Sequence, residues 1–239
     1  MSTELATTPD LTNLPSTQFD DSVFDDLAKA SDFLPRLQLY SKGKAIDKGK
    51  VRPGSYGIPM SKDDITDLGN SIDVLVLTRK PKAIDMGDTE AIISVYDPNS
   101  DEFKRIAAKS AERDSHCMYG VTFLVFERST GKFLEFFCGT KSSRGEAGKL
   151  YQYMPLSQNE IDAKGLEGVE AHGPLPVTLK SKLVEKGSFS WFVPVVQACS
   201  TPIELPEAAR VINEIHRFIA VKAPEVEKAP EQTGSRRAR

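Results

Sequence analysis

Residues 117–153 read CMYGVTFLVFERSTGKFLEFFCGTKSSRGEAGKLYQY and carry the strongest local signal for the fold. Two apolar, aromatic-rich runs, residues 119–127 and 132–138, flank a short turn that ends at Gly131. Two such runs joined by a Gly-containing turn are typical of a β-hairpin. A Gly- and Ser-rich stretch with three cations and two tyrosines follows the second run. The sequence therefore predicts an antiparallel pair of strands beside a cationic loop.

Further strand signals lie on both sides of this hairpin. Residues 71–86 and 91–97 read as strands, and residues 179–186 and 188–199 alternate around Lys186-Gly187 as a second hairpin. Pro194 within the last arm predicts an edge position or a bulge, because proline cannot donate to a strand ladder.

Helical spacing is confined to a few separated segments. Residues 100–113 place apolar side chains on one face, and residues 157–164 begin with a serine that has Glu160 three positions later, which is a capping-box pattern. Pro206 opens an amphipathic helix that reaches about residue 221. Residues 139–176 otherwise read as loop-rich.

Hairpins and separated helices together indicate a mainly β (α+β) chain. No strand–helix alternation occurs, which argues against a doubly wound parallel sheet. We expect an OB-like Greek-key antiparallel barrel with elaborated loops and a C-terminal helix, and a β-sandwich is the main alternative.

The charge distribution divides the chain into three parts. Residues 1–32 hold seven acidic side chains against one lysine and predict a disordered acidic segment, residues 33–221 form the folded domain, and residues 222–239 are a disordered tail. Residues 19–30 have the spacing of a short amphipathic helix. This helix either docks a partner protein or packs on the protein's own core, and the sequence leaves both open.

Composition and motifs argue against nucleotide-binding, metal-binding and nucleophilic sites. The net charge of −3 rules out a general polycation, so nucleic-acid affinity must come from local patches. Neither a P-loop nor a GxGxxG motif is present, and the three histidines are isolated, so we expect no metal, no cofactor and no enzyme. His116 and Cys117 are neighbours on a predicted strand and point to opposite faces, which disfavours a nucleophile–base pair.

No apolar run is long enough to span a membrane and no leader is visible, which predicts a cytoplasmic protein.

Cations and exposed rings at strand ends are what a single nucleic-acid strand requires, since cations meet phosphates and rings stack on bases. The predicted phosphate contacts are Arg36, Lys42, Lys44, Lys48, Lys50, Arg52, Arg79, Lys80, Lys82, Lys141, Arg144 and Lys149. The predicted stacking residues are Tyr56, Tyr119, Tyr151, Tyr153 and Trp191.

Four segments resemble single-stranded-DNA-binding proteins of bacteriophages: FLPRLQL (33–39), RPGSYGIP (52–59), CMYGVTFLVF (117–126) and FFCGTKSSRGEA (136–147). The resemblance implies an OB fold and binding of displaced single strands during DNA replication or recombination, in the cytoplasm of a bacterial host. In that family the acidic tail is C-terminal. Here the acidic segment is N-terminal and the chain ends in arginines, so recruitment of replication or recombination proteins would fall to residues 1–32.

The leading hypothesis is therefore non-catalytic binding of single-stranded DNA with little sequence preference. A structural or interaction protein, such as a virion component or a regulator of a host enzyme, is the alternative. A magnesium-dependent nuclease is a third reading, and the lack of a recognisable carboxylate constellation weighs against it. Homo-oligomerisation stays open.

Overall fold

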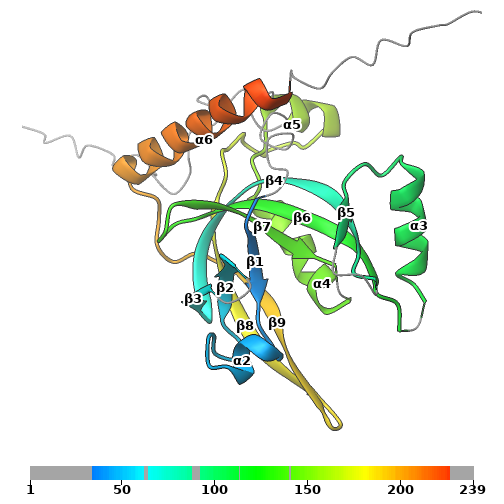
Figure 1. Cartoon of the computed structure of the whole chain (residues 1–239). Helices are drawn as coiled ribbons and strands as arrows, with labels where there is room; N and C mark the ends of the chain where they lie inside the picture. The colour runs from blue at the N-terminus through cyan, green and yellow to red at the C-terminus, as the bar shows by residue number, and fades with distance from the viewer. Residues whose placement is uncertain (1–33, 62–63, 88–91, 113, 140, 227–239) are drawn as a thin grey trace, which may run out of the picture.

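The computed structural model describes residues 34–61, 64–87, 92–112, 114–139 and 141–226, and the acidic segment and residues 227–239 lie outside this part. Residues 222–226, which the sequence predicts to belong to the disordered tail, are helical. Nine strands form one mixed sheet (Figure 1). Its order is β3 (Ile65–Gly69), β2 (Tyr56–Pro59), β1 (Arg36–Leu39), β7 (Lys132–Cys138), β6 (Cys117–Glu127), β4 (Ser71–Asp85), β8 (Pro176–Lys186) and β9 (Phe189–Ala198), with β5 (Ile93–Val95) also paired to β4. The predicted mainly β class is confirmed.

The expected antiparallel barrel is not confirmed. β1 runs parallel to β7, with Arg36 opposite Glu135, so the sheet is mixed. In the described part of the chain, the two end strands β3 and β9 do not pair, so the sheet is not closed. It is nevertheless curled, because the Ser41 hydroxyl donates to the Phe192 carbonyl at 3.2 Å and accepts from the Phe192 N–H at 3.0 Å. Ser41 thus ties the end of β1 to the free edge of β9.

Both predicted hairpins form. β6 and β7 pair from Val121 opposite Cys138 to Glu127 opposite Lys132. The Glu127 carboxylate accepts the N–H groups of Ser129 and Thr130 at 3.0 and 2.7 Å, which stabilises the turn. β8 and β9 pair from Val177 to Lys186, and Gly187 has the positive φ (62°) that this two-residue turn requires. β9 is an end strand of the sheet, as Pro194 predicts.

The sequence predicts three of the helices, and it predicts a serine cap for one of them, at Ser157. Ser100 caps α3 (Asp101–Lys109) and Ser157 caps α5 (Gln158–Lys164), each accepting a backbone N–H at 3.2 Å. The C-terminal helix is α6 (Leu205–Val226). One short helix, α2 (Lys44–Asp47), lies between β1 and β2.

The loop expected after β7 is a helix, α4 (Lys141–Leu150), followed by the 3₁₀ turn η2 (Tyr151–Tyr153). Two glycines lower its helix propensity, but Ala147 and Leu150 are buried against the sheet. Tertiary packing therefore overrides the local sequence preference.

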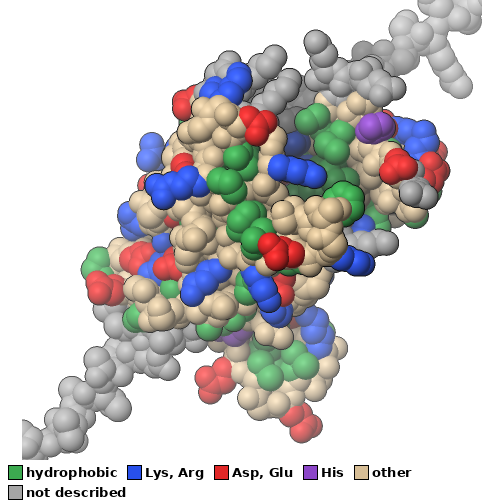
Figure 2. Space-filling model, turned by 90° about the horizontal axis from the view of Figure 1, so that it is seen from below, with side chains coloured by type: hydrophobic (Ala, Val, Ile, Leu, Met, Phe, Trp, Pro, Cys, Tyr) green, Lys and Arg blue, Asp and Glu red, His purple; other side chains and the backbone are tan. Residues whose placement is uncertain are grey.

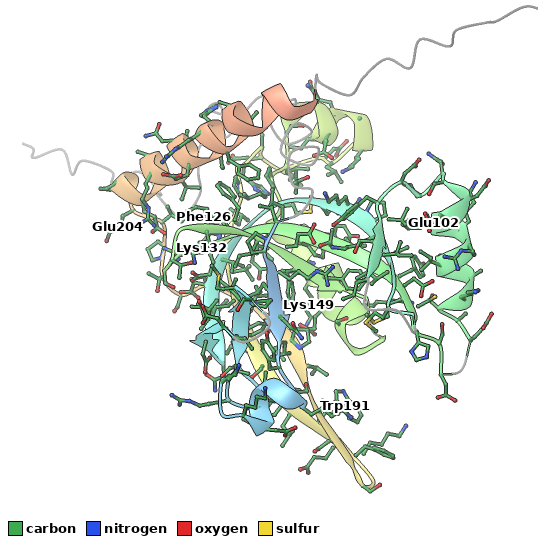
Figure 3. All side chains as sticks on the ribbon, in the orientation of Figure 1. Glu102, Phe126, Lys132, Lys149, Trp191 and Glu204 are labelled. Carbon is green, nitrogen blue, oxygen red and sulfur yellow. The ribbon has the colours of Figure 1, made fainter. Side chains whose placement is uncertain are left out.

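The core lies on both faces of the β4–β6–β7 region. α4 covers the face that carries Val76, Phe123 and Val125, and α6 covers the opposite face, where Phe126 lies beneath the helix (Figure 3). α3 closes a smaller cluster over Cys117 at the far end of β6. This alternation follows from the period of two along a strand.

Candidate nucleic-acid interface

A groove of about 510 Å³ opens at the end of β7. Strand β7 stops at Cys138, opposite Val121, whereas β6 continues to Cys117 with β4 on its other side. The groove fills this open edge and also contacts β1, β9 and the start of α4. Figure 2 shows the molecule from below, where hydrophobic side chains gather on the surface among both basic and acidic side chains.

The lining of the groove is mostly apolar, with a few polar groups. Met86, Met118 and Phe137 supply apolar surface, and Trp191 lies on the β9 side, where Figure 3 labels it. Two charged residues also line it: Arg36, which donates to the Ser94 hydroxyl at 3.3 Å, and Glu135, which forms an ion pair with Lys82. A mostly apolar cleft with a few polar groups suits a flat ring.

Tyr119 on β6 and Arg144 on α4 form a stacked pair. The guanidinium carbon of Arg144 lies 4.9 Å from the centroid of the Tyr119 ring, and its Nη2 donates to the Tyr119 carbonyl at 2.8 Å. Tyr119 is 40% exposed. The preceding residues, Met118 and Ser143, line the groove, whereas Tyr119 points to the other face of β6 and meets Phe103 of α3 edge-on at 6.4 Å.

Arg79 and Tyr151 form a second pair of the same kind. The guanidinium carbon lies 4.4 Å from the ring centroid, and Nη1 donates to the tyrosine hydroxyl at 3.0 Å. The Tyr151 ring is 39% exposed and meets Phe123 edge-on at 5.6 Å. Arg79 lies opposite Phe123, four residues from Tyr119 along β6, so the two pairs are about 13 Å apart at the usual rise of a strand.

The phosphate contact predicted for Lys82 is wrong, because this side chain is buried. Lys82 is 1% exposed and forms an ion pair with Glu135, which is 3% exposed. The Tyr96 hydroxyl donates to the second carboxylate oxygen of Glu135 at 2.9 Å. Burial lowers the pKa of Lys82, and Glu135 opposes this shift by hydrogen bonding and by its charge.

The stacking role predicted for Tyr56 is also excluded by burial. The ring is 0% exposed, contacts Phe136 edge-on at 6.2 Å, and donates its hydroxyl to the Lys180 carbonyl at 3.0 Å. Burial, with smaller contributions from Cys138 and Glu146, raises the pKa of this phenol. Tyr56 therefore belongs to the core.

The other predicted residues are spread over the surface. Lys42, Lys48 and Arg52 are exposed around α2, Lys50 is half-buried, and Arg52 lines a separate hollow with Asp67. Lys149 pairs with Glu146 at 2.8 Å, Lys80 lies over the Tyr96 ring at 4.1 Å, and Tyr153 packs half-buried against the core. The side chains of Lys44 and Lys141 lie outside the described part.

Sequence reasoning overlooked the lysines of β8. Lys180, Lys182 and Lys186 are exposed and share one face of the strand, and Phe189 lies opposite Lys186 on β9. A signal for them exists, because the three lysines occupy alternate positions of the run KSKLVEK (180–186).

Among the described residues, no three His, Cys, Asp or Glu side chains are placed to hold a metal ion. No helix in the described ranges has the length and hydropathy needed to cross a bilayer. Comparisons of the chain with protein-family models, with curated proteins and with solved structures gave no match.

Proposed function

We propose that the protein binds single-stranded DNA along the groove and the two Arg–Tyr pairs, without catalysis and with little sequence preference. The observation that carries the proposal is the pair of exposed tyrosines, Tyr119 and Tyr151, each stacked with an arginine. The resemblance to bacteriophage proteins suggests replication or recombination as the setting.

The chemistry of these pairs fits an unpaired strand. Bases of a single strand expose their faces, and stacking of one base on an aromatic ring contributes about 1–3 kcal/mol whatever the base. The guanidinium plane of an arginine offers a second stacking surface and two parallel donors for a phosphate. A duplex hides its base faces, so it would lack the stacking contribution at Tyr119 and Tyr151.

Local charge supplies the electrostatic part of the affinity. Arg36 lines the groove, and Arg144 and Arg79 place positive charge directly over the Tyr119 and Tyr151 rings. The net charge of −3 means that attraction to phosphates depends on these positions and not on the whole chain.

Fluorescence anisotropy with labelled single-stranded and duplex oligonucleotides across a salt series tests the proposal. The single strand should bind more tightly than the duplex, with affinity that falls steeply as salt rises. The double variant Arg79→Ala/Arg144→Ala should weaken this binding by at least about tenfold. It should also reduce the salt slope by about 0.7 for each phosphate that these arginines neutralise.

A matched control carries the same charge change elsewhere. Lys164 on α5 and Arg217 on α6 lie at the opposite end of the molecule from the β8–β9 turn (Figure 1). Lys164→Ala/Arg217→Ala should leave the affinity within about twofold, because neither side chain lines the groove or stacks on a tyrosine, and each is paired with a glutamate on its own helix. Absence of binding to the single strand at low salt would reject the proposal and favour an interaction protein.

A further inference from the structure

We propose that the β8–β9 hairpin is a contact arm for the duplex side of a junction between single-stranded and double-stranded DNA, with Phe189 placed against the terminal base pair. This inference rests on the proposed binding of single strands in the groove. It adds a preferred substrate, a forked DNA, and assigns a role to residues outside the predicted interface.

The outer part of the hairpin projects from the sheet. β8 pairs with β4 only from Pro176 to Lys180, and within the described residues the ladder beyond Ser181 joins β8 to β9 alone. Figure 1 shows this pair of strands extending past the rest of the molecule to its turn. A free two-stranded ribbon has the width that the major groove of B-DNA accepts.

One face of the arm is cationic. Lys180, Lys182 and Lys186 alternate along β8, are exposed, and form no ion pair with any described residue. They span about 20 Å at the usual rise of a strand. Three such lysines in a chain of net charge −3 form a local field that attracts a polyanion.

The tip carries an aromatic ring without a packing role. Phe189 is 70% exposed, adjoins the Gly187-Ser188 turn and lies opposite Lys186. Apolar side chains at such positions can enter between base pairs and unstack them. Lysines beside the ring would hold the adjacent phosphates.

The arm also connects to the groove. Trp191 lies opposite Val184, so it shares the face that carries Lys182 and Phe189, and it lines the groove as well. A strand that leaves a duplex at Phe189 would therefore reach the groove through Trp191. This continuity, together with the charge of the arm, favours a fork over an isolated duplex as the ligand.

The test uses the full chain and a forked oligonucleotide with 2-aminopurine in the first base pair of its duplex. The wild-type protein should bind the fork about tenfold more tightly than the single strand alone, and should raise the 2-aminopurine emission as the pair unstacks. Phe189→Ala should remove the emission change and most of the preference, with single-strand affinity retained within about twofold.

Leu183→Ala is the matched control, because Leu183 is also exposed (45%) but lies on the opposite face of the arm. It should behave as the wild type does. Lys182→Gln/Lys186→Gln should lower the affinity for the fork, and should reduce its salt slope by about 0.9 for each duplex phosphate that these lysines neutralise.

Two results would overturn the inference and leave the proposed function standing. One is equal affinity of the wild type for the fork and the single strand, and the other is a Phe189→Ala variant with unchanged emission and preference. Failure of the wild type to bind the single strand at all would overturn both the inference and the proposed function.

Discussion

Glu135→Gln should destabilise the protein strongly, because it leaves the Lys82 ammonium buried without a counter-charge. Both side chains are almost fully inaccessible, at 1% and 3% exposure, and the carboxylate also accepts the Tyr96 hydroxyl. Removing one partner of a buried ion pair costs about 3–5 kcal/mol of unfolding free energy. With an m-value of about 2 kcal/mol per M, the urea midpoint should fall by about 1.5–2.5 M.

The penalty should shrink as pH rises, which separates a charge effect from a packing effect. Burial already lowers the pKa of Lys82 from the ordinary 10.5, and loss of Glu135 lowers it further. Between that lowered pKa and the ordinary value the unfolded chain binds more protons than the folded one, so stability rises with pH. This gain is larger in the variant, and its deficit against the wild type should therefore decrease from about pH 6 to about pH 10.

Urea denaturation of both proteins across this range is the assay. The double variant Lys82→Met/Glu135→Gln removes both charges, keeps an acceptor for Tyr96, and should lie within about 1 kcal/mol of the wild type. A Glu135→Gln penalty below about 1 kcal/mol that is equal at both ends of the pH range would refute the reasoning, because it would mean that water reaches Lys82.

Three further predictions test the fold and the interface. Arg128→Ala removes two bonds of 2.7 Å to Glu207 at the start of α6 and should cost about 2–3 kcal/mol in urea denaturation, and a loss under about 0.5 kcal/mol would contradict this anchor. Gly120→Ala places a Cβ 2.3 Å from the Cys138 carbonyl oxygen and should cost about 2 kcal/mol or more, measured by thermal unfolding; an unchanged melting temperature would be inconsistent with this close approach. Deleting residues 1–32, which removes seven acidic side chains and one lysine, should raise single-strand affinity roughly three- to tenfold at low salt and less at high salt, and unchanged or lower affinity would reject shielding by this segment.

The parts of the fold that the sequence predicts correctly are those determined by neighbouring residues. The two hairpins follow from turn glycines at 131 and 187 between runs of strand-forming residues. The predicted cap at Ser157 accepts a backbone N–H three residues away. Each of these features is formed by residues that are close together in the sequence, so a short window of sequence is enough to predict it.

Features that depend on distant partners are not visible in such windows. Lys82 meets Glu135 across 53 positions, and Tyr56 reaches Lys180 across 124. The local sequence predicts that Lys82 and Tyr56 lie on the surface, because lysines are mostly exposed and tyrosines are often partly exposed. The parallel pairing of β1 with β7 is a non-local interaction of the same kind.

The groove itself arises from unequal strand ends that the sequence does not show. Residues 119–127 and 132–138 read as arms of similar length, but β6 begins at Cys117 and its first four residues extend beyond Val121, where β7 ends. β4 pairs with this extension on one side, and on its other side the Arg144 guanidinium from α4 donates to the Tyr119 carbonyl. Tyr119 of β6 and Tyr151 of η2 are each stacked with an arginine, whereas the densest run of lysines lies around α2. The interface proposed for this chain therefore follows from stacked Arg–Tyr geometry and not from charge clustering along the sequence.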